Sequence, residues 1–279
     1  MKKILTLIML LTMCGMGMIN AQDSLMTTKP QDSVMVPATD TTTTKSDTTS
    51  NSLFSPEKFD IKMTLATKNV WRGTAWGESP SFMPEAAWKV CKYAEIGVAG
   101  TATLNGSRVG YGNQFNMSVT LKPFVKAKSE IKNLIFSTTD VYYFSEFSRD
   151  NSYFAWSKEK TNHFVEGQIK YDSDFDFSVN YTYLANKAAN VDGIYFEAGY
   201  DISTSVNVFA GYVTDQNDLM FVNKGGWTNI GATISKPVKV AGCATALKLS
   251  VIANPNYEHV ADVPGVGNGP VYLVGSLVF

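Results

Sequence analysis

The segment Val271-Tyr-Leu-Val-Gly-Ser-Leu-Val-Phe279 places apolar side chains at every second position. Successive side chains of an extended strand point to opposite faces, so Leu273, Leu277 and Phe279 share one face. Val271 and Gly275 lie on that same face, and Tyr272, Val274, Ser276 and Val278 lie on the other. We therefore expect a β-strand here, and the same alternation guides the interpretation of the residues before it.

From residue 60 onward, segments of roughly ten residues alternate in polarity between clusters of Gly, Asn, Asp and Pro. Residues 175–183 are the clearest case, with Phe, Phe, Val, Tyr and Tyr on one face and Asp, Ser, Asn and Thr on the other. This pattern predicts an all-β fold, a closed antiparallel transmembrane β-barrel of about twelve strands. The expected strands are 60–71, 82–90, 94–104, 113–122, 132–146, 162–171, 174–184, 192–200, 205–213, 227–235, 244–253 and 270–279.

Short turns are expected at one end of this barrel and longer loops at the other, as in barrels that enter the membrane from the periplasm. Aromatic residues gather near both ends of the expected strands, which is typical of lipid headgroup belts. The outer belt would contain Trp71, Phe82, Tyr183, Tyr212 and Trp227. No apolar run reaches the roughly 18 residues of a spanning helix.

The N-terminal residues carry a targeting pattern. Two lysines, a short apolar stretch and Ala21 predict a signal peptide over residues 1–21. Cys14 leaves a lipid-anchored alternative open, although the bulky Met13 precedes it. Residues 22–58 are rich in Thr, Ser and Asp, and we expect a disordered periplasmic linker before a barrel over residues 59–279. Four Asp-Ser/Thr triplets in the linker resemble bacterial O-glycosylation sequons, which makes Ser24, Ser33, Thr41 and Thr48 candidate sites.

The formal net charge of −1 offers no basic excess for phosphates, so no nucleic-acid partner is expected. Cys91 and Cys243 fit no zinc spacing, and the sequence leaves open whether they form a disulfide. We expect no metal site and no cofactor, because the sequence has no phosphate-binding glycine loop or cluster of metal ligands.

Alternation assigns charged residues of both signs to the inner face of the barrel. They are expected to line the pore: Lys62, Glu85, Lys89, Glu95, Glu166, Lys170, Asp176, Glu197 and Lys248. Phe164, Tyr195 and Phe209 also point inward by this rule. A barrel of about twelve strands is intermediate between a filled interior and a wide channel, so a plugged lumen remains an alternative.

Catalysis at the lipid boundary would need a nucleophile with a His or carboxylate beside it. The two histidines are His163, near the outer end of an expected strand, and His259, in a long loop. Neither lies in a recognisable catalytic pattern, so we expect no enzymatic activity and assign no catalytic residues.

Two resemblances support the barrel interpretation. The alternation that ends at Phe279 is similar to the C-terminal signal read by the barrel assembly machinery, which implies an assembly role for Leu273, Leu277 and Phe279. The segment Thr67-Lys-Asn-Val-Trp-Arg-Gly-Thr74, with residues 80–88 and 94–100, resembles the start of the TorF-type porins. That resemblance implies an outer-membrane barrel with Arg72 and Gly73 at the rim of the first outer loop.

The expected function is passive diffusion of small polar solutes across the outer membrane. We expect the barrel to lie in the lipid of the outer membrane and the linker to lie in the periplasm. The alternative is a non-conducting scaffold whose loops or linker bind a partner in the cell envelope.

Overall fold

The computed structural model describes residues 54–77, 79–104, 113–144, 153–262 and 266–279. The predicted signal peptide, most of the predicted linker and the candidate glycosylation sites Ser24, Ser33, Thr41 and Thr48 lie outside these residues. Near the C-terminal boundary of the predicted linker, the ring of Phe54 stacks on Trp88 of the barrel wall, with 5.2 Å between ring centroids. The chain therefore contacts the barrel from Phe54 onward.

The strands are β1 (Phe59–Ala66), β2 (Val70–Trp71), β3 (Thr74–Trp76), β4 (Ser81–Cys91), β5 (Ala94–Thr103), β6 (Gln114–Leu121), β7 (Leu134–Tyr143), β8 (His163–Tyr171), β9 (Phe175–Leu184), β10 (Tyr195–Ser203), β11 (Val206–Val213), β12 (Gly226–Val240), β13 (Cys243–Ala253), β14 (Val266–Gly267) and β15 (Val271–Val278). Short 3-10 helices are η1 (Pro56–Lys58), η3 (Glu130–Asn133) and η4 (Tyr257–His259). Within the described ranges no helix has the length and apolarity needed to cross a membrane.

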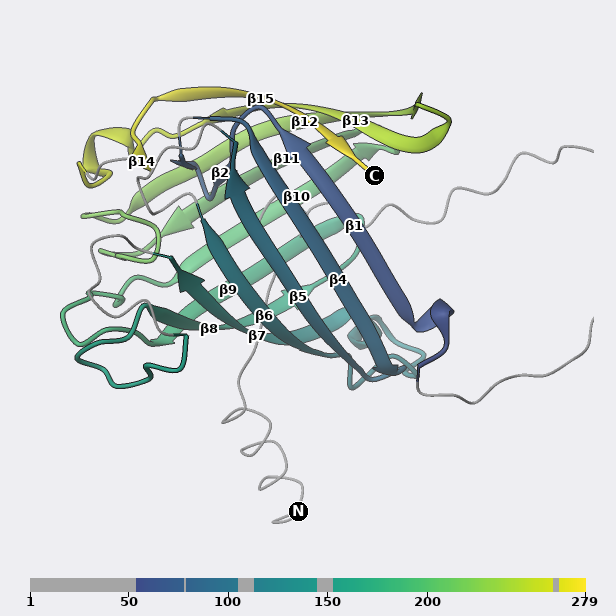
Figure 1. Ribbon diagram of the computed structural model, residues 1–279, viewed down its shortest axis with the longest axis horizontal. Helices are drawn as coiled ribbons and strands as arrows, with labels where there is room; N and C mark the ends of the chain where they lie inside the picture. Colours follow the sequence, from purple (N-terminus) through teal and green to yellow (C-terminus); the bar gives the residue numbers. More distant parts are fainter. Residues whose placement is uncertain (1–53, 78, 105–112, 145–152, 263–265) are drawn as a thin grey trace, which may run out of the picture.

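Twelve strands close into one antiparallel barrel, in the order β1-β15-β13-β12-β11-β10-β9-β8-β7-β6-β5-β4, with β4 pairing back to β1 (Figure 1). Each barrel strand pairs with the next one along the chain, as expected for a meander of hairpins. The prediction of an all-β closed antiparallel barrel of about twelve strands is confirmed. We call the end with the short β4–β5, β8–β9, β10–β11 and β12–β13 turns the turn end, and the opposite end the loop end.

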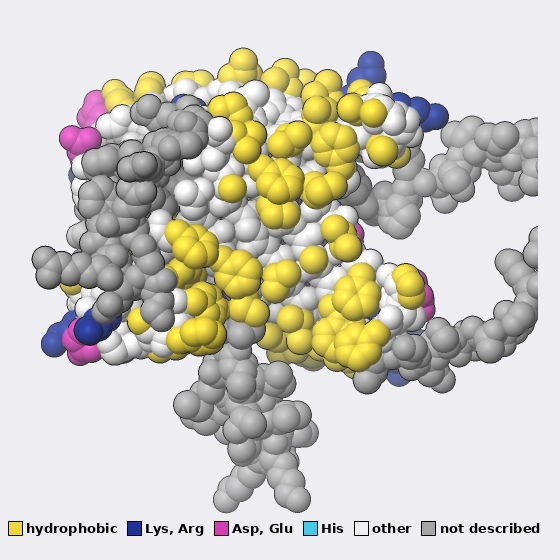
Figure 2. All heavy atoms as spheres, viewed as in Figure 1, with side chains coloured by type: hydrophobic (Ala, Val, Ile, Leu, Met, Phe, Trp, Pro, Cys, Tyr) yellow, Lys and Arg dark blue, Asp and Glu magenta, His cyan; other side chains and the backbone are white. Residues whose placement is uncertain are grey.

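The barrel has its apolar side chains outside and its polar side chains inside. In β9, Phe175, Phe177, Tyr181 and Tyr183 are exposed, whereas Asp176, Ser178, Asn180 and Thr182 are buried. Figure 2 shows hydrophobic side chains spread over the outer surface of the strands, with charged side chains toward the two ends. A soluble barrel would have the opposite arrangement, because burial of apolar surface stabilises a water-soluble fold.

The seam between β1 and β15 closes the barrel. The register pairs Thr64 with Val278, Leu65 with Leu277 and Ala66 with Ser276. Beyond these pairs, the Phe279 N–H donates to the Met63 carbonyl at 2.9 Å, and the Met63 N–H donates to the Phe279 carbonyl at 3.2 Å. Residue Phe279 therefore extends a short seam by two hydrogen bonds.

The first expected strand is shorter in the structure. The first was expected to run to residue 71, but β1 ends at Ala66, and β2 and β3 leave the wall as a separate hairpin that pairs with β14. Trp71 was expected in the outer aromatic belt. That expectation is wrong, because Trp71 is buried inside the barrel.

At the turn end, β12 runs to Val240 rather than to residue 235 as expected, and β12 and β13 project beyond their neighbours. Their tight turn places Ala241 at φ 49° and Gly242 at φ 85°, as a two-residue hairpin turn requires. Pro237 lies in this projection, where β12 pairs with β13 alone, because the β11 pairing stops at Ile234. A proline is tolerated there, since its missing N–H faces no neighbouring strand.

Candidate functional site: the barrel lumen

All nine charged residues predicted to line the pore lie on the inner side of their strands. Lys62 pairs in register with Glu85, and Lys89 with Glu95. Their burial differs: Glu166, Lys170, Asp176 and Glu197 are buried. The remaining five, Lys62, Glu85, Lys89, Glu95 and Lys248, are more exposed. The structure therefore does not gather the nine into one ring.

One buried group of polar side chains lines the inner wall along β7, β8 and β9. Lys170 Nζ lies 2.9 Å from Asp172 Oδ1 and 3.9 Å from Asp176 Oδ2. Deeper in the wall, Gln168 donates from Nε2 to Asn180 Oδ1 at 2.8 Å. Because these charges are paired locally, this wall presents polar surface without a strong field of either sign.

A second polar group lies on β10 and β12. The Tyr195 hydroxyl donates to Glu197, and the Asn229 amide donates to the same carboxylate at 2.7 Å. Tyr195, Glu197 and Asn229 are all buried. Alternation correctly predicted that Tyr195 points inward, but it could not reveal this hydrogen-bonded partner.

The β2–β3 hairpin folds into the lumen from the loop end. At its tip, Arg72 donates from Nη1 and Nη2 to the two carboxylate oxygens of Glu166, at 2.6 and 2.7 Å. The guanidinium also lies 4.2 Å from the Trp71 ring centroid and 4.4 Å from the Tyr195 ring centroid. The guanidinium group is planar, so it can form two parallel hydrogen bonds with the carboxylate in its plane and lie against the aromatic rings with its faces.

The tip fits the wall closely at Gly73. This residue has φ 80°, and a Cβ atom there would lie 1.5 Å from the Thr228 carbonyl oxygen. Asn254 donates from Nδ2 to the Gly73 carbonyl at 2.9 Å. The expected roles of a turn glycine and a carboxylate-bound arginine agree with these contacts, but the expected position was wrong. The pair lies inside the lumen, and Glu166 belongs to β8, which is separated from β1 by β4, β5, β6 and β7.

The β11–β12 connection packs against the hairpin. Leu219, Met220 and Val222 are inaccessible to solvent, as is Trp76 of the hairpin. Thr74 donates from Oγ1 to the Met220 carbonyl at 3.2 Å. We define the plug as the apolar cluster of Trp71, Trp76, Leu219, Met220 and Val222, which contacts Val141, Tyr143, Tyr195 and Val213 of the walls. The sequence did not reveal the plug, because residue type alone does not show where a loop folds.

His163 lies on the outer face of β8 and is fully buried. Its Nδ1 is 2.7 Å from Asp140 Oδ1, and its Nε2 donates to the Tyr153 carbonyl at 2.6 Å. The Trp156 ring stacks on it, with 3.8 Å between centroids. Both ring nitrogens are engaged by protein groups, so in this arrangement the ring has no free nitrogen to exchange a proton with a substrate.

The Tyr153 hydroxyl completes this covered site. It donates to Asp140 Oδ2 at 3.0 Å. Burial, and then the nearby Asp140 carboxylate, raise the pKa of Tyr153 well above its ordinary value. The hydroxyl therefore keeps its proton and remains a donor over the whole physiological pH range. We call residues 153–162 the outer strap, since they cover the Asp140–His163 pair on the outside of the barrel.

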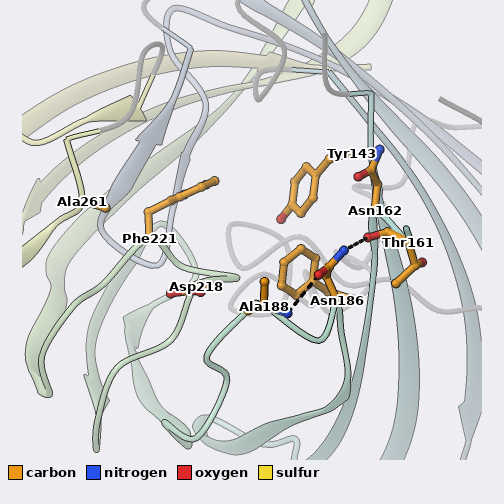
Figure 3. Close-up of a pocket in the computed structure, with 10 residues that line it drawn as sticks. Tyr143, Thr161, Asn162, Asn186, Ala188, Asp218, Phe221 and Ala261 are labelled. Carbon is orange, nitrogen blue, oxygen red and sulfur yellow. Dashed lines mark hydrogen bonds between the residues drawn. The ribbon is translucent and has the colours of Figure 1, made fainter. Parts of the chain in front are cut away.

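A cavity of about 440 Å³ opens at the loop end, directly above the plug (Figure 3). Its lining residues come from several outer connections and the ends of two strands: Tyr143, Thr161, Asn162, Phe164, Asn186, Ala188, Ala189, Asp218, Phe221 and Ala261. Alternation indicated that Phe164 faces inward, but nothing in the sequence brings these loops together.

Among the described residues the structure shows neither a cluster of metal ligands nor a disulfide bond. No group of three or more His, Cys, Asp or Glu in those ranges could hold a metal ion. Cys91 and Cys243 are both exposed and free.

No protein-family model matches the chain. No curated protein matches it either. Among solved structures, the crystal structure of Pseudomonas aeruginosa OprD is similar with a TM-score of 0.30 and 8% identity. The match covers 80% of this chain and 66% of that protein, so the chain spans just under two thirds of its length.

Proposed function

We propose that this chain is an outer-membrane β-barrel that passes small polar solutes, and that the plug holds its loop end closed in the state described here. The reversed polarity of the wall carries the proposal: exposed aromatic and aliphatic side chains outside, buried polar side chains inside. A closed barrel satisfies all strand hydrogen bonds within the wall, which makes it one of the two structures that can span lipid.

The ends of the strands support one orientation. The first residue of β1 and the last residue of β15 lie at the turn end. Four of the five connections between strands at that end are short, the β6–β7 connection is longer, and the other connections lie at the loop end (Figure 1). In outer-membrane barrels short turns face the periplasm and long loops face outward. The predicted linker would then lie in the periplasm, with its candidate O-glycosylation sites, and Phe279 would reach the assembly machinery from that side. The resemblance of residues 67–74 to the TorF-type porins agrees with this proposal.

Packing of the plug also favours a second function, a non-conducting scaffold. Trp76 and Met220 are inaccessible to solvent, and Arg72 is tied to Glu166 by a buried pair, so the hairpin is firmly held. In this second function the barrel holds the loops or the linker in the membrane, where they bind a partner protein of the cell envelope. A protein that co-purifies with the full chain but not with a chain lacking residues 22–53 would support the scaffold.

Swelling of proteoliposomes distinguishes the two functions. We expect slow swelling of vesicles containing the native chain in arabinose, and several-fold faster swelling with Gly73→Ala, because that change unseats the hairpin. The Gly242→Ala chain is the control, since a Cβ at Gly242 meets nothing within 4 Å. If vesicles with the native, Gly73→Ala and Gly242→Ala chains, all folded, swell no faster than empty vesicles, the chain does not conduct solutes and the scaffold function is favoured.

A further inference from the structure

The cavity above the plug has three aromatic walls. Tyr143 and Phe164 meet edge to face, with 5.5 Å between their centroids. Phe221 faces them from the β11–β12 connection (Figure 3). Trp76 supports the walls from below, with centroid distances of 5.0 Å to Tyr143 and 4.9 Å to Phe221. Because Trp76 is fully buried, these rings are held in place before any ligand arrives.

Phe221 is held in an unfavourable backbone conformation. Its φ of 55° lies in the left-handed region, which is unfavourable for a residue that carries a Cβ atom. The neighbouring backbone fixes it: Asn217 and Val222 exchange hydrogen bonds of 2.8 and 3.1 Å, and Ala261 donates to the Phe221 carbonyl at 2.6 Å. Such strain persists where the surrounding structure determines it, and it is frequent at ligand clamps. Here it presents an aromatic ring to the cavity.

Polar groups form the other edge of the cavity. In Figure 3 the Tyr143 hydroxyl points into the space between Phe221 and Asn186, and the Asn162 amide lies beside Tyr143. Asn186 fixes this edge by donating from Nδ2 to the Thr161 carbonyl at 3.1 Å and accepting from the Ala188 N–H at 3.0 Å. The Asn162 and Asn186 amides thus belong to the polar edge of the cavity.

Among the described residues that line the cavity, the charge is negative. Asp218 is the charged member of the lining, and its carboxylate accepts from the Asn190 N–H at 2.7 Å and from Gln216 Nε2 at 3.1 Å. Both donors are neutral, so these two hydrogen bonds do not cancel the negative charge of the carboxylate. An anionic ligand is therefore disfavoured.

We propose that this cavity binds a neutral sugar, a monosaccharide or disaccharide whose apolar ring face lies on the aromatic walls and whose hydroxyls meet Asn162 and Asp218. The volume of about 440 Å³ suits a small ligand, and ligand sites favour mouths of β-barrels lined by aromatic residues with a few polar groups. Aromatic rings supply flat apolar area at little entropic cost, while the polar edge fixes orientation. Binding at this position does not require the barrel to conduct.

Saturation-transfer NMR on the full chain in detergent micelles tests the proposal with glucose, galactose, N-acetylglucosamine and maltose as neutral probes. Glucose 6-phosphate is the anionic comparison. We expect saturable binding of at least one neutral probe and about tenfold weaker binding of the phosphorylated sugar, which corresponds to about 1.4 kcal/mol.

Three variants test whether the NMR signal of sugar binding comes from the cavity. Phe221→Gly removes a wall and relieves the left-handed strain, and Asn162→Ala removes a polar contact without touching the plug cluster. Each should weaken binding about tenfold. Phe154→Ala, at an exposed ring outside the cavity lining, should leave it unchanged. The proposal is overturned if no neutral probe binds more tightly than about 10 mM, if the anionic sugar binds best, or if Phe221→Gly and Asn162→Ala both bind as the native chain does.

Discussion

The guanidinium of Arg72 and the carboxylate of Glu166 are joined by two hydrogen bonds of 2.6 and 2.7 Å across 94 residues of sequence. Both side chains are buried, so the pair ties the hairpin tip to the β8 wall in a region from which water is excluded. The pair connects the first connection after β1 to the far side of the lumen. We therefore expect this pair to help hold the hairpin inside the barrel.

Removal of one partner should be costly. Arg72→Ala leaves Glu166 buried without its counterion, which typically costs about 3–5 kcal/mol, whereas Arg72→Met with Glu166→Gln should recover part of that loss. Arg72→Lys should be intermediate, because an ammonium group cannot reproduce the bidentate contact. Urea unfolding in lipid vesicles, followed by tryptophan fluorescence, measures these differences.

Lys62→Ala is the control for that series. Lys62 is also on the inner face, but its side chain is about half exposed and lies 3.9 Å from a similarly exposed Asp60. Exposed pairs of this kind contribute little. Equal stability of the Arg72→Ala and Lys62→Ala chains would show that the buried pair does not hold the hairpin.

Gly73→Ala should displace the hairpin, since its Cβ would lie 1.5 Å from the Thr228 carbonyl oxygen. We expect a cysteine at position 74, where Thr74 is inaccessible, to react with maleimide only when Gly73→Ala is also present. The exposed Cys91 and Cys243 are first replaced by serine.

Gly242→Ala provides the matched control for the labelling, because Gly242 shares the positive φ of Gly73 but has open space around it. It should leave position 74 unreactive. Labelling of position 74 in an otherwise native chain would contradict a seated hairpin.

The strand pattern could be predicted from the sequence because alternation is a local property. In β9 the lipid-facing rings and the inner polar residues follow from period two alone. The fate of residues 70–76 could not be predicted in the same way. An extended apolar run such as Val70 and Trp71 is compatible with continuing the wall. The inward hairpin depends instead on contacts with residues distant in sequence, such as Arg72 with Glu166 and the Gly73 carbonyl with Asn254.

The outer strap should loosen when the Asp140–His163 pair is broken. His163→Ala removes the donor to the Tyr153 carbonyl, and Asp140→Asn weakens the acceptor for the Tyr153 hydroxyl. A lost hydrogen bond to a charged group costs about 1.5–3 kcal/mol, so amides of the outer strap should exchange hydrogen roughly tenfold or more faster. Hydrogen–deuterium exchange with mass spectrometry measures this rate.

His259→Ala is the comparison for the outer strap. His259 lies in η4, where its backbone carbonyl accepts from the Asn223 N–H at 2.8 Å and its backbone N–H donates to the Asn256 carbonyl at 2.9 Å, so these bonds do not need the imidazole ring. Exchange in the outer strap should be unaffected by this change. Equal exchange in the native, His163→Ala and His259→Ala chains would mean that the pair does not fasten the outer strap.

Deletion of Phe279 should impair barrel closure before it alters any transport. The deletion removes two backbone hydrogen bonds with Met63 from the short β1–β15 seam, together with the predicted assembly signal. We expect lower levels of heat-modifiable barrel in the membrane fraction, and Phe279→Leu should retain most of the native level because it keeps the backbone pair. Native levels of the deleted chain would contradict this role.

The lumen was less predictable than the wall for a physical reason. Alternation shows which side of a strand a residue occupies, and Glu166 and Glu197 are both buried in the structure. Alternation does not show which loop packs over them. The plug and the cavity both depend on contacts between residues far apart in sequence, such as Trp76 with Tyr143 and Phe221.

Single-channel recording in planar bilayers tests most directly whether the β2–β3 hairpin closes a solute conduit. The native chain is compared with one in which residues 70–76 are replaced by a Gly-Ser segment, after heat-modifiable mobility has shown that both are folded. We predict a native chain that is closed nearly all the time and a replaced chain with sustained open steps. A folded replaced chain that is as silent as the native one would contradict the account.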